Sequence, residues 1–217
     1  FALALCFVVI VVGAYVRLSD AGLGCPDWPG CYGHLGVPEA PHEVAHAEQQ
    51  FEQPVEAHKA WKEMFHRYIA STLGALIVLL AVMSVFLRRQ GVPQVLPWLL
   101  VGAVLFQGAL GAFTVLWKVK PLTVSAHLLM GLMTLSMLLW LRLSIAFAKP
   151  VEAPAKADRE LRNERHAWSA MQETGSAVLS AVAPRGLRRF AAFATVLVVL
   201  QIFLGGWTSS NYAALAC

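Results

Sequence analysis

The stretch that decides the fold is KEMFHRYIASTLGALIVLLAVMSVFLRR, residues 62–89, in which a long apolar run follows a polar start that contains a histidine. A helix needs about 20 mostly apolar residues to cross the hydrocarbon core of a bilayer. The chain has five such runs, predicted at 1–18, 67–88, 95–117, 122–147 and 189–209. Its 217 residues are 58% hydrophobic and 14% charged. Soluble domains carry roughly 25% charged residues, so an all-α membrane protein is predicted.

The connectors between these runs differ in charge, and the difference predicts their side of the membrane. Residues 19–62 are mostly acidic, whereas 88–94 and 148–188 gather Lys and Arg. Because Lys and Arg collect in cytoplasmic loops, the N-terminus is expected inside, and 19–66, 118–121 and 210–217 outside. Two lysines in 118–121 count against this orientation, but the basic connectors outweigh them. The net charge of +4 forms no basic stripe with interleaved aromatic residues, so membrane lipids and not nucleic acid are expected partners.

The chain also repeats itself. GAYVRLSDAGLGC, residues 13–25, aligns without gaps with GGWTSSNYAALAC, residues 205–217, and QGALGAFT, residues 107–114, aligns with QIFLGGWT, residues 201–208. Small residues also recur where helices pack closely in lipid, but the length of the first match favours a duplication. We therefore expect a transmembrane four-helix bundle plus a fifth helix that opens a second repeat. The expected divisions are a first repeat 1–147 with an outer loop 19–66, a cytoplasmic linker 148–188, and a truncated second repeat 189–217.

Two histidines lie at the start of apolar runs that enter the membrane from the same side. His66 belongs to the stretch quoted above, and His127 to PLTVSAHLLMG, residues 121–131. At 1.5 Å per residue, each is expected within roughly 10 Å of the outer interface. Ionisable groups inside a membrane are costly and usually functional, and haem iron accepts axial histidines. The pair therefore predicts a bis-histidine haem site, with two hydrogen-bonded interfacial histidines as the alternative.

Three charged residues lie near this pair. Glu63 precedes His66 by three residues, on the same face of a helix. It could orient the imidazole, move protons or stabilise positive charge, or it could be a solvated carboxylate. Arg17 and Arg67 are predicted at outer helix ends, where they either snorkel to the interface or pair with the carboxylates of a porphyrin.

Cys25 and Cys31 bracket the turn-rich loop GCPDWPGC, residues 24–31, on the predicted oxidising face. A disulfide across this short loop is expected there. Whether it is structural or exchanges electrons is left open by the spacing. Cys217 is the repeat counterpart of Cys25, and Cys6, within the first run, is expected to act as a small hydrophobe.

Taken together, these motifs resemble haem A synthase. The resemblance rests on GAYVRLSDAGLGCPDWPGCYG (residues 13–33), Glu63-x-x-His66-Arg67, QGALGAFTV (residues 107–115) followed by PLTVSAHLLMG, and the late GGWTSSN with Cys217. Members of that family have eight transmembrane helices in two halves, each with a histidine pair. They convert haem O to haem A by oxidising a ring methyl group to a formyl group.

The resemblance implies roles for particular residues. His66 and His127 match the pair of the first half, which faces the haem substrate, and Glu63 matches a functionally important acid. Cys25 and Cys31 match the disulfide of the outer loop, and a haem b is expected in the missing second half. The implied partners are haem O, an electron donor and the enzyme that produces haem O. The implied location is the bacterial inner membrane, with the mitochondrial inner membrane as the weaker alternative.

Two other functions remain as alternatives to this haem-modifying oxidoreductase. A bis-histidine haem b protein would only carry electrons, and it would not require Glu63 beside the pocket. A haem transporter or assembly factor would use the histidines structurally, and a haem spectrum of the purified protein separates it from the other two.

Overall fold

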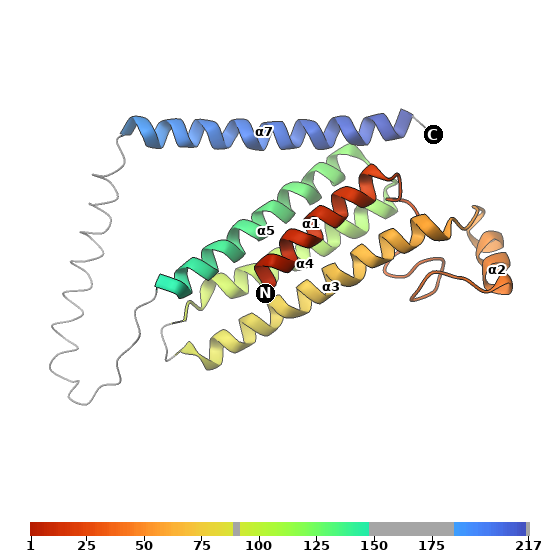
Figure 1. Cartoon of the computed structure of the whole chain (residues 1–217), viewed down its shortest axis with the longest axis horizontal. Helices are drawn as coiled ribbons and strands as arrows, with labels where there is room; N and C mark the ends of the chain where they lie inside the picture. Colours follow the sequence, from red (N-terminus) through yellow and green to blue (C-terminus); the bar gives the residue numbers. More distant parts are fainter. Residues whose placement is uncertain (89–91, 148–184, 216–217) are drawn as a thin grey trace. The chain divides into compact units, whose positions relative to one another are not determined.

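The computed structural model of the chain describes residues 1–88, 92–147 and 185–215. These residues form the helices α1 (Ala2–Leu18), α2 (Pro41–Phe51), α3 (Ala57–Phe86), α4 (Val95–Leu116), α5 (Pro121–Phe147) and α7 (Arg185–Leu215), and no β-strand (Figure 1). Four described segments are long and apolar enough to cross a membrane, namely α3, α4, Pro121–Ala146 of α5 and Ala192–Ser209 of α7. Helix α1 is apolar and has 17 residues. The prediction of an all-α membrane protein is confirmed.

Helices α1, α3, α4 and α5 form a four-helix bundle (Figure 1). Helix α1 contacts α3 and α5, and α4 contacts the same two helices. Because α3 and α5 make no such contact with each other, they are diagonal partners, as are α1 and α4. The interior is apolar and centres on Cys6, Leu73, Ile77, Leu100, Leu138 and Leu141.

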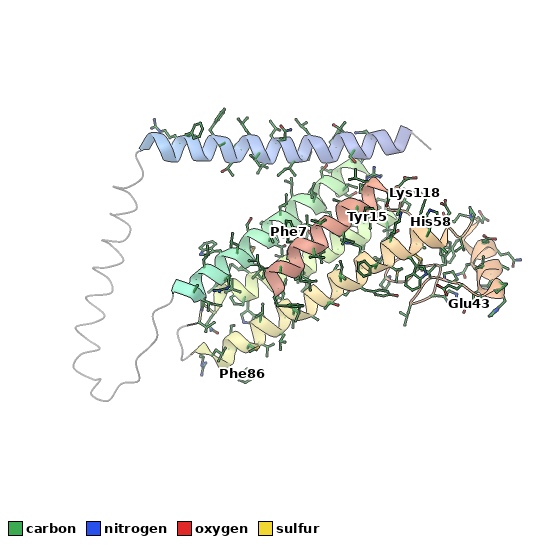
Figure 2. All side chains as sticks on the ribbon, viewed as in Figure 1. Phe7, Tyr15, Glu43, His58, Phe86 and Lys118 are labelled. Atoms are coloured by element: carbon green, nitrogen blue, oxygen red, sulfur yellow. A yellow bond between two sulfur atoms is a disulfide. The ribbon has the colours of Figure 1, made fainter. Side chains whose placement is uncertain are left out.

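The outer faces of the bundle are apolar as well. In each of the three spans of the bundle, only 22% of the most apolar window is buried within the protein. Large side chains such as Phe7 and Phe86, labelled in Figure 2, are 59% and 80% exposed. Exposed apolar patches of this extent mark a surface that faces lipid or a partner. Because these helices are long enough to cross a bilayer, we expect their exposed apolar faces to contact lipid.

Residues 19–56 form a compact loop, most of the predicted outer loop, with a core of its own. Its buried residues are Cys25, Cys31, Tyr32, Val37 and Ala47, which pack on Ala60 and Met64 of α3. The Tyr32 hydroxyl donates to the Pro54 carbonyl at 3.0 Å, and its ring meets Phe51 edge to face. Helix α2 lies within this loop and was not predicted. Its signals are Pro41 at the first helical position and Glu43, whose carboxylate accepts from two backbone N–H groups before the helix.

The helix boundaries differ from the predicted ones at two places. Helix α3 begins at Ala57 and not at 67, so His66 lies inside the helix and not at its mouth. The first turns of α3 are too polar to be read as a span, but their buried face packs on the outer loop, and this packing extends the helix. Helix α7 runs over 185–215 where 189–209 was predicted.

Some predictions lie outside the described residues. Most of the linker 148–188 and the counterpart cysteine Cys217 are among them. Within the described part, residues 1–147 and 202–215 belong to one compact unit, and residues 185–201 of α7 belong to another.

Candidate haem site and the loop clamp

The two histidines are carried by the diagonal helices α3 and α5. His66 is on α3 and His127 on α5. The Nδ1 atom of each imidazole is buried and has no hydrogen-bond partner among the described residues. A buried polar nitrogen without a partner is costly, so both rings are suited to bind something that the protein chain itself does not supply.

The donor set fits a haem better than a bare metal ion. Among the described residues there is no group of three or more His, Cys, Asp or Glu side chains that could hold a metal ion. A porphyrin brings four nitrogen ligands of its own and leaves two axial positions, which histidine fills in many haem proteins. Two imidazoles from diagonal helices in an apolar bundle match that need.

Each histidine has support from a neighbouring helix. The His66 ring lies against Gly13 of α1, and the His127 ring lies against Gly111 of α4. The side-chain amide of Gln107 donates to the backbone carbonyl of His127 at 2.9 Å. Neither glycine nor Gln107 was predicted as a site residue. The repeat alignment, which contains all three, was the signal that could have found them.

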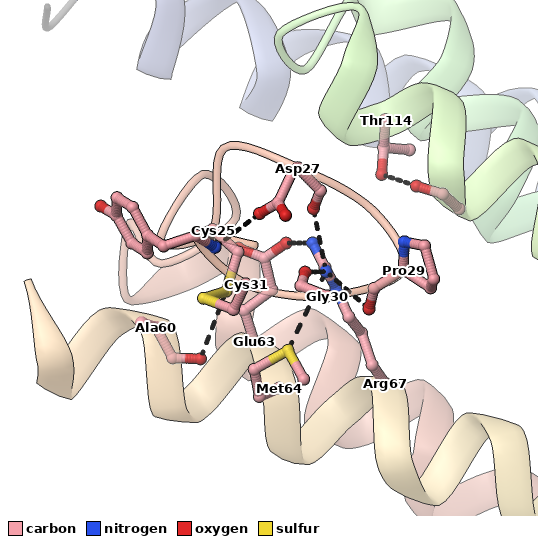
Figure 3. A network of polar contacts seen from close by, with 12 residues as sticks. Cys25, Asp27, Pro29, Gly30, Cys31, Ala60, Glu63, Met64, Arg67 and Thr114 are labelled. Atoms are coloured by element: carbon pink, nitrogen blue, oxygen red, sulfur yellow. Dashed lines mark hydrogen bonds and ion pairs between the residues drawn. A yellow bond between two sulfur atoms is a disulfide. The ribbon is translucent and has the colours of Figure 1, made fainter. Parts of the chain in front are cut away.

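Glu63 is buried, and its carboxylate is fully engaged (Figure 3). One oxygen, Oε2, accepts the backbone N–H of Cys25 at 3.0 Å. The other, Oε1, pairs with Nη2 of Arg67, one turn further along α3. Only 6% of the Glu63 side chain is exposed, so the solvated-carboxylate alternative is wrong. Because His66 Nδ1 has no partner among the described residues, Glu63 does not orient that ring through this atom.

Arg67 connects α3 to the outer loop. Its Nη1 donates to the backbone carbonyls of Asp27 at 3.0 Å and Pro29 at 3.3 Å, and also to that of Gly30 (Figure 3). The Arg67 side chain is 12% exposed, so it does not snorkel to water. We call Glu63 and Arg67 the loop clamp, because together they fasten the loop of residues 25–31 to α3.

The loop is built to fit this clamp. Cys25 and Cys31 are joined by a disulfide, and both are fully buried. The carboxylate of Asp27 accepts the N–H groups of Tyr32 at 2.6 Å and Gly33 at 2.8 Å. Aspartate commonly closes turns in this way, so Asp27 in GCPDWPGC is a sequence signal for this turn.

The loop also depends on a glycine. At Gly24 a Cβ would lie 2.6 Å from the backbone carbon of Lys59 in α3. Only glycine therefore allows the loop backbone to approach the helix this closely.

Arg17 has a different environment. Its Nη2 donates to the Ser209 carbonyl at 2.8 Å, and its Nε is buried without a hydrogen-bond partner among the described residues. Arg17 therefore keeps a buried donor for an anionic group, whereas Nη1 and Nη2 of Arg67 are both engaged within the protein.

Fold and site together define the class: an all-α membrane protein with a histidine pair inside a four-helix bundle, beneath a disulfide-bonded loop. The model of the COX15-CtaA family, described as cytochrome oxidase assembly protein, matches residues 1–217. The chain belongs to this family, and the predicted family resemblance is confirmed.

Curated relatives carry the name haem A synthase. One from Shewanella oneidensis is 44% identical over 210 residues, which are 96% of this chain and 55% of the relative. One from Shouchella clausii is 23% identical and covers 96% of the chain and 57% of the relative. One from Hyphomonas neptunium is 29% identical and covers 70% and 50%. The chain thus spans about half the length of these relatives, all of them bacterial. No solved structure matches the chain significantly.

Proposed function

We propose that this chain is the substrate-binding first half of a membrane haem A synthase, which oxidises a methyl group of haem O to the formyl group of haem A. The observation that carries the proposal is the pair of imidazoles on diagonal helices, each with a buried nitrogen that no described residue hydrogen-bonds. The relatives named haem A synthase support the same reaction.

In this proposal different residues bind different parts of haem O. His66 and His127 would hold its iron. Arg17 binds a propionate through its Nε, which has no partner within the described part of the chain, since guanidinium and carboxylate form strong charge-assisted hydrogen bonds. Arg67, the second predicted propionate contact, instead binds the loop carbonyls of Asp27 and Gly30 through Nη1 and pairs with Glu63 through Nη2.

The reaction sets requirements for partners. Bound haem O supplies both the iron and the methyl carbon that is oxidised. Written as two oxygen insertions at that carbon followed by loss of water, the conversion consumes two O₂, four electrons and four protons, and yields the formyl group and three waters. An electron donor must therefore reach the protein, and an enzyme that makes haem O must supply it.

Glu63 is the acid that we assign to this chemistry. Its buried carboxylate lies one turn before His66 on α3, so its negative charge offsets positive charge that develops beside the pocket. The oxygen Oε2, which is bound to a backbone N–H and not to the guanidinium, is the atom that would accept a proton.

The proposed setting is the bacterial inner membrane, with the N-terminus and the linker 148–188 in the cytoplasm and the outer loop on the opposite side. The second repeat opens with α7 in this proposal, because the chain spans about half the length of its relatives. A haem b is expected in that second half.

Extraction and chromatography of the haem bound to the purified full-length protein tests the proposal. Haem O or haem A is the expected result, and it should be lost in His66→Ala and in His127→Ala. Haem b as the only haem, reduced in amount in both variants, would favour the bis-histidine electron carrier. A protein without any haem would favour the transporter or assembly factor.

A further inference from the structure

The contacts of Gly13 differ from those of an ordinary glycine in a helix–helix interface. A Cβ built at Gly13 would lie 2.8 Å from Cε1, 3.3 Å from Nε2 and 3.4 Å from Nδ1 of His66. Glycines in membrane helices usually allow two backbones to approach each other. Here the three nearest atoms all belong to one imidazole ring, so the space that Gly13 leaves is filled by His66.

Gly111 repeats this arrangement on the opposite side of the bundle. A Cβ there would lie 3.2 Å from Cε1, 3.7 Å from Nδ1 and 4.0 Å from Nε2 of His127. Gly13 and Gly111 lie on the diagonal helices α1 and α4, and each is five residues from the end of its helix. Both also align with Gly205 in the internal repeat. Two positions that align with the same residue of the repeat therefore each face one histidine of the pair.

We propose that Gly13 and Gly111 are positioning residues that seat the imidazoles of His66 and His127, so that both rings are held at one level of the bundle for axial ligation. The seat is the space left by the missing Cβ, and any larger residue would displace the ring from it. Glycine is unfavourable in a helix interior, and the seat is the reason that it stands at these two positions. The inference rests on the proposed function, and it adds the residues that determine the geometry of the ligands.

The contact distances predict a graded series of effects. A contact of 2.8 Å cannot be accommodated without moving the imidazole, whereas 3.2 Å requires a shift of only a few tenths of an ångström. Gly13→Ala should therefore be more harmful than Gly111→Ala. Gly102 and Gly108 are also on α4, and no atom of the residues that the structure describes lies within 4 Å of the added Cβ. Gly102→Ala and Gly108→Ala are the matched controls.

The first measurement is made on the full-length protein with bound haem. The signal of this half is defined as the low-spin haem signal that His127→Ala removes. Gly13→Ala should weaken haem retention at this site by about tenfold or more, the usual effect of disturbing the support of a metal ligand, and should shift the g-values of the low-spin ferric signal. Gly111→Ala should give a smaller loss and a smaller shift, and the two controls should give neither.

The second measurement is made on the haem-free protein and does not depend on the proposed function. Gly13→Ala should lower the Tm, and most of that loss should disappear when His66 is also replaced by Ala, because the colliding ring is then gone. The double-mutant cycle isolates this interaction. Gly108→Ala should show no coupling to His66→Ala.

The results of these two measurements distinguish a failure of the seat proposal from a failure of the proposed function. If Gly13→Ala lowers the Tm equally with and without His66, the glycine serves helix packing and the seat proposal is overturned. It is also overturned if Gly13→Ala and Gly111→Ala match the controls in both measurements. A wild-type protein without haem O or haem A would instead contradict the proposed function, while the coupling in the haem-free protein would still support or overturn the seats.

Discussion

The loop clamp gives a prediction with a magnitude, because Arg67→Ala removes one partner of a buried ion pair. In the wild type, the side chains of Arg67 and Glu63 are 12% and 6% exposed, and Nη1 of Arg67 also binds three loop carbonyls. Removing one member of a buried pair typically costs about 3–5 kcal/mol, since the other charge stays buried and unpaired. We expect Arg67→Ala to fall in that range.

Two further variants test whether the shape of the guanidinium matters as well as its charge. Arg67→Lys keeps the charge, but one ammonium group cannot bind Glu63 and the loop carbonyls at once. It should cost about 1.5–3 kcal/mol, the usual value of hydrogen bonds to a charged group. The double variant Glu63→Met/Arg67→Met leaves no buried charge and should recover much of the loss.

The assay is unfolding in detergent micelles, combined with the rate at which dithiothreitol reduces the Cys25–Cys31 disulfide. Arg88→Ala is the matched control, because Arg88 is an exposed arginine just beyond the end of α3 and surface substitutions usually stay within about 0.5 kcal/mol. Arg67→Ala should unfold more easily and be reduced faster. If it matched Arg88→Ala in both measurements, the reasoning about the clamp would be refuted.

Three more predictions concern the site and the outer loop. Glu63→Gln should keep bound haem but lower the formation of haem A, because it removes the charge and keeps an acceptor for Cys25; unchanged product formation would remove Glu63 from the chemistry. Alkylation of the unreduced protein followed by mass spectrometry should leave Cys25 and Cys31 unmodified, and stoichiometric labelling of both would contradict the disulfide. The backbone N–H groups of Ala40 and Glu39 lower the pKa of Glu43 from 4.5, so its support of α2 is present above that pH and lost as the pH falls through the lowered value. Hydrogen exchange at the start of α2, corrected for intrinsic rates, should therefore rise at low pH in the wild type, and Glu43→Gln should not show this rise.

The sequence predicts the membrane helices well, because an apolar run long enough to span a bilayer has few other stable structures. It predicts the early start of α3 poorly. Residues 57–66 are polar and resemble a connector, and only the packing of Ala60 and Met64 on the outer loop shows why the helix continues there. Helix α2 could have been predicted from Pro41 and from Glu43 two residues later, since both are signals of a helix start.

The residues of the candidate site were predictable only in part from the sequence. His66 and His127 stand out because polar groups are rare in apolar runs, and the spacing of Glu63 and Arg67 suits an ion pair along one helix. The burial of that pair depends on loop residues that lie 37 to 40 positions earlier in the chain, which spacing does not reveal. The faces of Gly13 and Gly111 that meet the imidazoles likewise depend on how four helices pack.

The central claim is that His66 and His127 bind the same haem iron. It is tested most directly by electron paramagnetic resonance and near-infrared magnetic circular dichroism of the ferric full-length protein, comparing the wild type with His66→Ala, His127→Ala and the control His58→Ala. His58 is an exposed histidine in the first turn of α3. The account predicts that one bis-imidazole low-spin signal is lost in both site variants, that it is the same signal in each, and that it persists in His58→Ala. Loss of different signals in the two site variants, or full retention in either one, would contradict the account.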